Sequence, residues 1–163
     1  MKDFFISYSP KDKNWAEWIA WQLEDAGYKV AIRAWDIRPG GNIILDLQKA
    51  IAESERTIAV LSPDFMSSVI VKPEWAAALA QDFSGNKNKL VPVRVYECDA
   101  VGLLAQLATI DLVGLSEKQA VDALLAGVQL GRAKPTHSPN FPGPLEERAI
   151  PTLPPFPTSL GIE

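Results

Sequence analysis

Apolar residues in the first 131 positions gather in five short runs, and longer segments with helical periodicity lie between them. The runs occupy residues 4–8, 29–33, 57–61, 90–95 and 109–113. Several of them are almost continuously apolar, as strands are when both faces of their sheet are covered. The alternation of such runs with helical segments predicts a parallel sheet with crossover helices.

The segments between the runs have the spacing of amphipathic helices. In the first segment, the apolar residues that fall on one helical face are Trp15, Trp18, Ile19, Leu23 and Ala26. Asp12 is expected to cap the start of this helix, and Gly27 is expected to end it. Further helices are predicted at residues 43–53, 73–82, 103–107 and 117–130.

Strands that alternate with helices in this way predict an α/β fold. The expected architecture is a flavodoxin-like, doubly wound, five-stranded parallel sheet in the order 2-1-3-4-5, with helices on both faces. This domain is expected to span residues 1–131. Most of the 13 prolines follow it, and such a composition favours an extended, solvated backbone over a core. Residues 132–163 are therefore predicted to form a proline-rich linker or tail, which would lead to a further domain.

Composition and charge exclude several classes of function. With 16 basic and 20 acidic residues and a net charge of -4, the chain has no basic surplus for binding nucleic acid. The single cysteine, Cys98, and the single histidine, His137, cannot make an intrachain disulfide or a convincing metal cluster. No apolar stretch approaches the roughly 18 residues of a membrane span, and the start is not a signal peptide. We therefore expect a cytoplasmic protein without membrane contact, metal ion or bound cofactor.

The loops after the first three predicted strands are where a ligand is expected, because open sheets of this type bind ligands beyond the carboxyl ends of their strands. These loops comprise residues 7–12, 35–42 and 62–74. Asp64, in the third loop, has no obvious basic partner and is interpreted as a turn residue after Pro63. Cys98 is interpreted as a bystander in a later loop.

Three sequence features resemble the TIR (Toll/interleukin-1 receptor) domain family. Phe5-Ile6-Ser7-Tyr8 resembles the opening strand of that family, and residues 35–41 resemble the Pro-Gly loop after its second strand. Val60-Leu61-Ser62-Pro63, followed by Glu74, resembles its third strand and the helix that carries the family's catalytic glutamate. The segment Pro73-Glu74-Trp75-Ala76-Ala77 is most similar to bacterial members.

Enzymatic members of the family cleave NAD at the bond between nicotinamide and ribose, and some form cyclic products. Breaking this bond generates an oxocarbenium-like ribosyl centre, which a nearby carboxylate can stabilise. The resemblance assigns this catalytic role to Glu74, with NAD as a substrate rather than a cofactor. The alternative is structural, because a carboxylate that follows Pro73 at a helix start also complements the helix dipole.

The resemblance also implies an aromatic surface for nicotinamide and cations for the phosphates. Ile70 stands where enzymatic members often carry tryptophan, so Trp35 or Phe65 would provide the ring, unless both belong to the core. The arginines that some members place after the first strand are absent here. Arg38 and Lys11 would contact the phosphates instead, and solvated surface is the alternative for each.

Gly40 and Gly41 permit positive φ and a close approach of the backbone to a ligand, or else form an ordinary turn after Pro39. The full set of substrate-binding candidates is Tyr8, Ser9, Lys11, Trp35, Asp36, Arg38, Gly40, Gly41, Asn42, Phe65 and Ile70.

Two functions compete at this point. The first is an NAD hydrolase of signalling or defence that is activated when TIR domains associate with one another. The second is a non-catalytic interaction module that recruits other TIR domains through residues 35–42 and neighbouring helix surfaces. A phosphoacceptor domain would need clustered acidic residues at the end of the first strand, and Ser7-Tyr8-Ser9 does not provide them.

Overall fold

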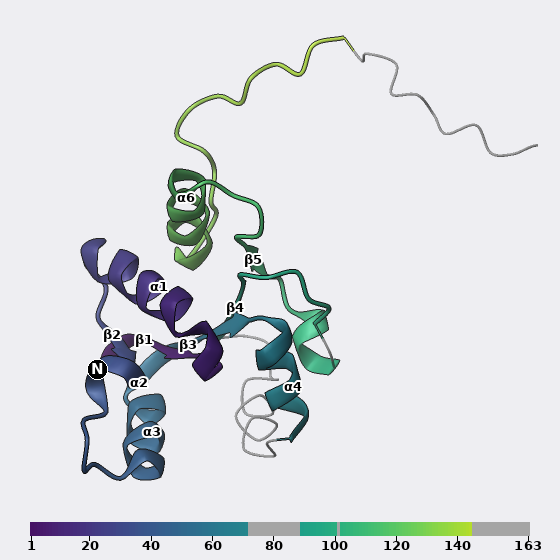
Figure 1. Ribbon diagram of the computed structural model, residues 1–163. Helices are drawn as coiled ribbons and strands as arrows, with labels where there is room; N and C mark the ends of the chain where they lie inside the picture. The colour runs from purple at the N-terminus through teal and green to yellow at the C-terminus, as the bar shows by residue number, and fades with distance from the viewer. Residues whose placement is uncertain (72–88, 101, 145–163) are drawn as a thin grey trace, which may run out of the picture. The chain divides into compact units, whose positions relative to one another are not determined.

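The computed structural model describes residues 1–71, 89–100 and 102–144. Contacts divide the chain into two units, Met1–Ala133 and Lys134–Glu163. The strands of the first unit are β1 (Lys2–Ser7), β2 (Val30–Ile32), β3 (Ser54–Leu61), β4 (Leu90–Arg94) and β5 (Ile110–Asp111). They form one parallel sheet in the order β2-β1-β3-β4-β5, which confirms the predicted topology (Figure 1).

Helices connect the strands, and four of them lie close to predicted positions. They are η1 (Pro10–Asp12), α1 (Lys13–Asp25), α2 (Arg33–Asp36), α3 (Ile43–Ala52), α4 (Pro63–Val71), η2 (Gly102–Gln106) and α6 (Glu117–Val128). The helix predicted at residues 73–82 lies outside the described residues. A capping box of Ser116 and Gln119 begins α6, and its last carbonyls gain a donor because Arg56 Nη2 donates to Val128 O at 2.6 Å.

Three helical elements, η1, α2 and α4, lie where loops were predicted. Residues 62–74 were expected to be irregular, yet α4 begins at Pro63 because Ser62 caps it. The backbone N–H of Phe65 donates to Ser62 Oγ at 3.1 Å. A serine followed by proline at the first helical position is a recognised helix start. The short α2 and η1 were also missed, since four and three residues are too few to show helical periodicity.

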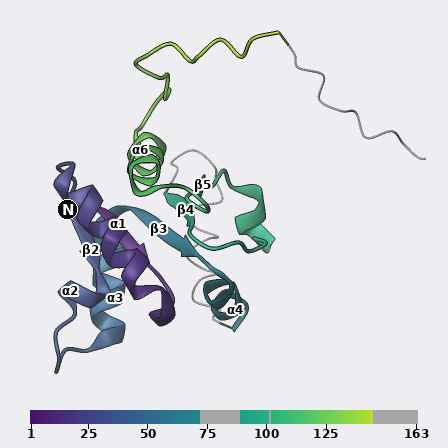
Figure 2. The same cartoon turned by 45° about the horizontal axis from the view of Figure 1, so that its top comes forward.

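The core lies on both faces of the sheet because alternate residues of a strand point to opposite sides. On one face, Ile58 and Val60 of β3 belong to a cluster that joins the sheet to α1 and α6. On the other face, Ala59 and Leu61 belong to a smaller cluster with α4 and η2. Figure 2 turns the first face forward, so that α1 lies in front of β2.

The edge strand β5 has only two residues, and side chains hold it in place. The guanidinium of Arg94 on β4 donates to both carboxylate oxygens of Asp111, at 2.6 and 3.3 Å. This hydrogen bonding holds the pKa of Asp111 below its ordinary value, against a smaller opposing effect of burial. A bidentate ion pair of this kind fixes the register of β5 against β4. Backbone hydrogen bonds alone would define that register weakly, because β5 is so short.

Candidate functional site

A pocket of about 400 Å³ lies beyond the carboxyl ends of β1 and β2. Its walls come from the turn after β1, the first residue of α1, the short helix α2 and the loop that leads to α3. The lining residues are Tyr8, Pro10, Lys13, Arg33, Ala34, Ile37, Arg38, Pro39, Gly40, Gly41 and Ile43. The pocket therefore occupies the kind of position where open parallel sheets bind ligands.

Positive charge dominates this pocket. Lys13, Arg33 and Arg38 line it, and no carboxylate is among its lining residues. Tyr8 adds a phenol whose pKa is raised above its ordinary value, chiefly by burial. The phenol is therefore protonated at neutral pH and able to donate a hydrogen bond. Three cations and a hydroxyl donor suit an anionic ligand such as a phosphate or diphosphate.

The loop between α2 and α3 needs its two glycines for different reasons. Gly40 has a φ of 91°, a conformation that L side chains rarely adopt. At Gly41, an added Cβ would lie 2.8 Å from Asp46 Oδ2 and 3.2 Å from Arg38 O. Glycine at position 41 therefore lets the loop pass close to the first turn of α3 and to the backbone carbonyl of Arg38.

Of the predicted substrate-binding residues, the structure brings Tyr8, Arg38, Gly40 and Gly41 together in this pocket. The pocket also contains Lys13 and Arg33, which the sequence analysis missed. Arg33 was assigned to the second strand, and Lys13 was hidden inside the first helix. The available signal was their position: Arg33 follows the carboxyl end of β2, and Lys13 begins α1 after the carboxyl end of β1. Both positions lie at the same edge of the sheet.

The other predicted residues of the second loop have structural contacts. Trp35 is half-buried against the main core. The carboxylate of Asp36 accepts a hydrogen bond of 2.7 Å from the backbone N–H of Ile32, at the end of β2. The side chain of Asn42 caps α3 by accepting from Leu45 N at 3.1 Å. None of these three residues lines the pocket.

The remaining predicted residues lie elsewhere. Ser9 is buried at the start of η1. Phe65 is 3% exposed and packs in the smaller core cluster, so its ring is not a stacking surface at the pocket. Ile70 lies within α4, and Glu74 lies outside the described residues. The proposed catalytic carboxylate is therefore carried by the sequence resemblance alone.

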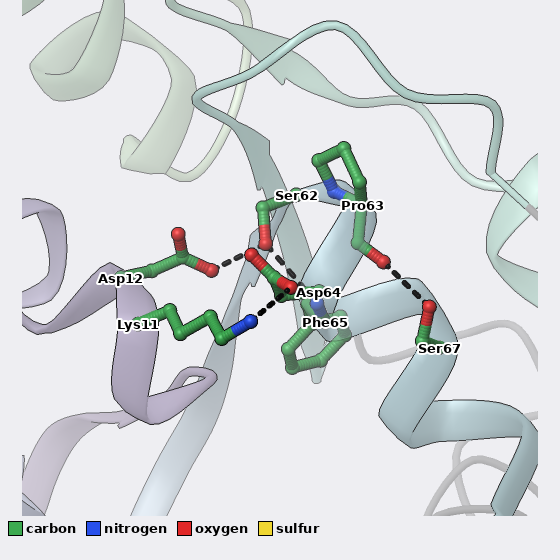
Figure 3. Close-up of polar contacts among 7 residues, drawn as sticks. All are labelled: Lys11, Asp12, Ser62, Pro63, Asp64, Phe65 and Ser67. Atoms are coloured by element: carbon green, nitrogen blue, oxygen red, sulfur yellow. Dashed lines mark hydrogen bonds and ion pairs between the residues drawn. The ribbon is translucent and has the colours of Figure 1, made fainter.

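A polar cluster joins η1 to the start of α4 between the ends of β1 and β3, where the strand order reverses (Figure 3). The hydroxyl of Ser62 donates to Asp12 Oδ2, and both residues are buried. Beside this pair, Lys11 Nζ lies 3.4 Å from Asp64 Oδ1. The interpretation of Asp64 as a turn residue without a basic partner was therefore wrong, because the partner comes from a distant loop.

The same cluster corrects the expected cap of α1. Asp12 occupies the N-cap position, but its side chain makes no capping hydrogen bond. The carboxylate is instead directed across the sheet edge to Ser62. Burial raises the pKa of Asp12 above its ordinary value, and the hydrogen bond from Ser62 opposes that shift.

Three further features of the described residues concern metal ligands, membrane spans and the single cysteine. No group of three potential metal ligands occurs within residues 1–71, 89–100 and 102–144. Over the same residues, no helix has both the length and the apolar character needed to cross a bilayer. Burial raises the pKa of the Cys98 thiol, which keeps it protonated and a poor nucleophile.

A doubly wound sheet in the order β2-β1-β3-β4-β5, with a basic pocket beyond β1 and β2, defines the chain as a flavodoxin-like α/β domain. Within that class, a family model described as TIR domain matches residues 4–125. The chain belongs to the TIR domain family.

Known relatives agree with this assignment. The chain is 32% identical to Protein toll of Drosophila melanogaster over 94 residues, which cover 56% of this chain and 9% of that protein. The TIR domain of the Toll-related receptor TRR-2 from Hydra magnipapillata aligns with a TM-score of 0.58 and 25% identity, covering 77% of this chain and 93% of that one. A metazoan TIR-STING receptor from C. gigas in complex with 2',3'-cGAMP aligns with a TM-score of 0.61 and 26% identity, covering 76% and 39%.

Proposed function

We propose that this TIR domain hydrolyses NAD at the bond between nicotinamide and ribose, in a signalling or defence system, and that self-association activates it. The observation that carries the proposal is the basic pocket formed by Lys13, Arg33 and Arg38. NAD has a diphosphate at its centre, and the lining of the pocket offers three cations and no carboxylate. Of these cations, Lys13 also pairs with Glu17, whose Oε1 lies 3.7 Å from Lys13 Nζ. Electrostatic complementarity of this kind favours binding and orientation of the diphosphate.

The proposed chemistry takes place at the ribose carbon that bears nicotinamide. The bond to nicotinamide breaks with its electron pair, so neutral nicotinamide leaves and positive charge develops on the ribose. Glu74 would stabilise that charge through its carboxylate. Attack by water, with loss of a proton, gives ADP-ribose, and attack by the adenine of the same molecule gives a cyclic product.

The test of this function is nicotinamide release by the purified chain, both at high concentration and with several copies artificially clustered. Clustering matters because a domain that assembly activates is silent when dilute. Release of nicotinamide with formation of ADP-ribose or a cyclic product supports the proposal. A folded protein that releases none even when clustered would contradict it.

Removing one cation should weaken the interaction with NAD while leaving the fold intact. Arg38 is exposed at the pocket rim, so Arg38→Ala should raise the NAD concentration for half-maximal turnover by about tenfold, as expected for loss of a charge-assisted hydrogen bond. Lys118→Ala is the matched control, because Lys118 is exposed on α6 and does not line the pocket. Equal effects of the two changes would place the diphosphate elsewhere.

A second candidate function is self-association without catalysis, and the surface of α3 favours it. This helix follows the loop of residues 35–42 directly and has no buried residue. Ile43, Ile44 and Leu45 are 46%, 68% and 60% exposed. Apolar side chains gathered on one exposed helix are typical of a contact surface. A purely recruiting domain would associate through this surface and leave NAD unchanged.

A charge at the centre of this surface should weaken association between copies. We expect Ile44→Glu to lower the self-association constant, measured by analytical ultracentrifugation, by at least about tenfold, since an isoleucine buried in a contact contributes roughly 1.5–3 kcal/mol. Gln106→Glu adds the same charge at an exposed polar position of a different element, η2, and serves as control. Unchanged association with a lower melting temperature would show that Ile44 packs within its own chain.

The bacterial subtype and the role of the tail stay predictions. The segment Pro73-Glu74-Trp75-Ala76-Ala77, which suggested bacterial members, lies outside the described residues, and the relatives named above are animal proteins. We also propose that residues 132–163 form a proline-rich linker to a further domain, which could bring several TIR domains together.

A further inference from the structure

A second pocket, of about 380 Å³, lies between α1, the start of α6 and the residues that follow β4. Its character differs from that of the basic pocket. Three aromatic rings, those of Trp15, Trp18 and Tyr96, contribute to its walls, and Glu117 contributes a carboxylate. No lysine or arginine is among its lining residues.

The ring of Trp15 packs edge-to-face against each of the other two rings. The ring centroids of Trp15 and Trp18 are 5.8 Å apart with an interplanar angle of 81°. Those of Trp15 and Tyr96 are 6.4 Å apart with an angle of 85°. Edge-to-face packing fixes the rings relative to one another, and rings at right angles can form adjoining walls of one pocket. Tyr96 is nevertheless 50% exposed, so much of its ring surface is open to a ligand.

The only formal charge in this lining is negative. Glu117 is exposed in the first turn of α6, and no lysine or arginine among the described residues forms an ion pair with it. It is not used as the helix cap either, because Ser116 and Gln119 form the capping box. A carboxylate beside several aromatic rings attracts a cation through both its charge and the negative faces of the rings.

We propose that this second pocket binds a quaternary ammonium group. A trimethylammonium cation has no N–H group to satisfy, so aromatic rings and one carboxylate can hold it without further hydrogen-bond acceptors. An anion would be repelled by Glu117, and a neutral apolar group would gain nothing from it. The basic pocket and this pocket thus select ligands of opposite charge at the start of the same helix, since Lys13 lines one and Trp15 lines the other.

The test is a titration of the full chain with choline, followed by the indole N–H signals of the tryptophans in NMR spectra. Saturable shifts are expected for Trp15 and Trp18 but not for Trp21, which is 64% exposed on α1 and outside the pocket. The neutral carbon isostere of choline, in which a tert-butyl group replaces the trimethylammonium group, should bind at least about tenfold more weakly. Equal binding of the isostere would overturn the proposal, and so would the absence of any saturable shift.

Two variants locate the binding determinants. Glu117→Gln should weaken choline binding severalfold, and Trp18→Leu should weaken it by about tenfold. The matched control, Trp21→Leu, should bind choline like the original protein. Trp18 also packs against the core, so Trp18→Leu could fail to fold. In that case the Glu117→Gln result is the deciding test. Unchanged affinity in Glu117→Gln, or equal losses in the two tryptophan variants, would overturn the assignment.

A last comparison identifies the source of the cation. Two ligands present the same trimethylammonium group: free choline, and a peptide that contains trimethyllysine. Tighter binding of the peptide would assign the pocket to a methylated protein side chain, whereas tighter binding of choline would assign it to a small molecule. Both outcomes support a quaternary ammonium site.

Discussion

Changing Glu74 to glutamine should abolish nicotinamide release by the clustered domain and leave the domain folded. Glutamine has nearly the same shape as glutamate but lacks the negative charge. If Glu74 stabilises positive charge on the ribose, that stabilisation is lost, and turnover should fall by at least about a hundredfold. The rate is measured as nicotinamide formed per minute, and the fold is checked by circular dichroism and thermal unfolding.

A change of the same kind away from the pocket shows whether the loss is specific. Glu24 is exposed on α1 and does not line the basic pocket, so Glu24→Gln should hydrolyse NAD at the original rate. If Glu74→Gln also keeps that rate, Glu74 is not catalytic, and its place after Pro73 reflects only the preference of helix starts for carboxylates. Loss of activity together with loss of thermal stability would support that structural role.

Hydrophobic periodicity was sufficient to predict the sheet and its longer helices. Buried parallel strands and amphipathic helices of ten or more residues carry a strong repeating signal, and all five strands lie near their predicted positions. The missed helical elements carried a weaker signal. The four residues of α2 span about one helical turn, and α4 is apolar without a clear polar face, so only its Ser62-Pro63 start distinguishes it from a loop.

The candidate site could be predicted only in part, because sequence patterns do not show which distant side chains meet. Arg38, Gly40 and Gly41 could be located from the loop that contains them. Arg33 could not, because its position in the pocket depends on α2 beginning directly after β2. In the same way, the contact of Lys11 with Asp64 arises only when β1 and β3 become neighbours.

The hydrogen bond between Asp12 and Ser62 should be one of the strongest polar determinants of stability. Asp12 is 3% exposed and Ser62 is fully buried. Asp12→Ala leaves the Ser62 hydroxyl without its acceptor, and such a loss costs about 1–3 kcal/mol. We expect that decrease in the free energy of unfolding, measured by urea denaturation. It is a large fraction of the total for a domain of this size, which is typically about 5–15 kcal/mol.

Two comparisons make this prediction specific. Because Ser62 and Asp12 act as a pair, the double variant Asp12→Ala with Ser62→Ala should lose less than the sum of the two single changes. Lys11→Ala removes only an ion pair whose lysine is 77% exposed, so it should cost at most about 1 kcal/mol. Additive losses from the two buried residues would show that they act independently.

The pH dependence of Asp12 has a defined sign. Burial raises its pKa in the folded protein above the ordinary value of 3.8, so the folded state holds this proton more tightly than the unfolded state does. The stability that comes from this proton is fully present below the ordinary pKa and is lost as the pH rises through the pKa of the folded state. Asp12→Asn keeps an oxygen acceptor for Ser62 but does not titrate.

The difference in unfolding free energy between the original protein and Asp12→Asn should therefore fall as the pH is raised from about 4, and should level off above the folded pKa. Urea denaturation of both proteins across that range measures it. A difference that grows with pH would mean that Asp12 stabilises the fold as a carboxylate, with the hydrogen bond from Ser62 outweighing burial. In either case the pair joins η1 to the start of α4, because Ser62 both donates to Asp12 and accepts from the backbone N–H of Phe65.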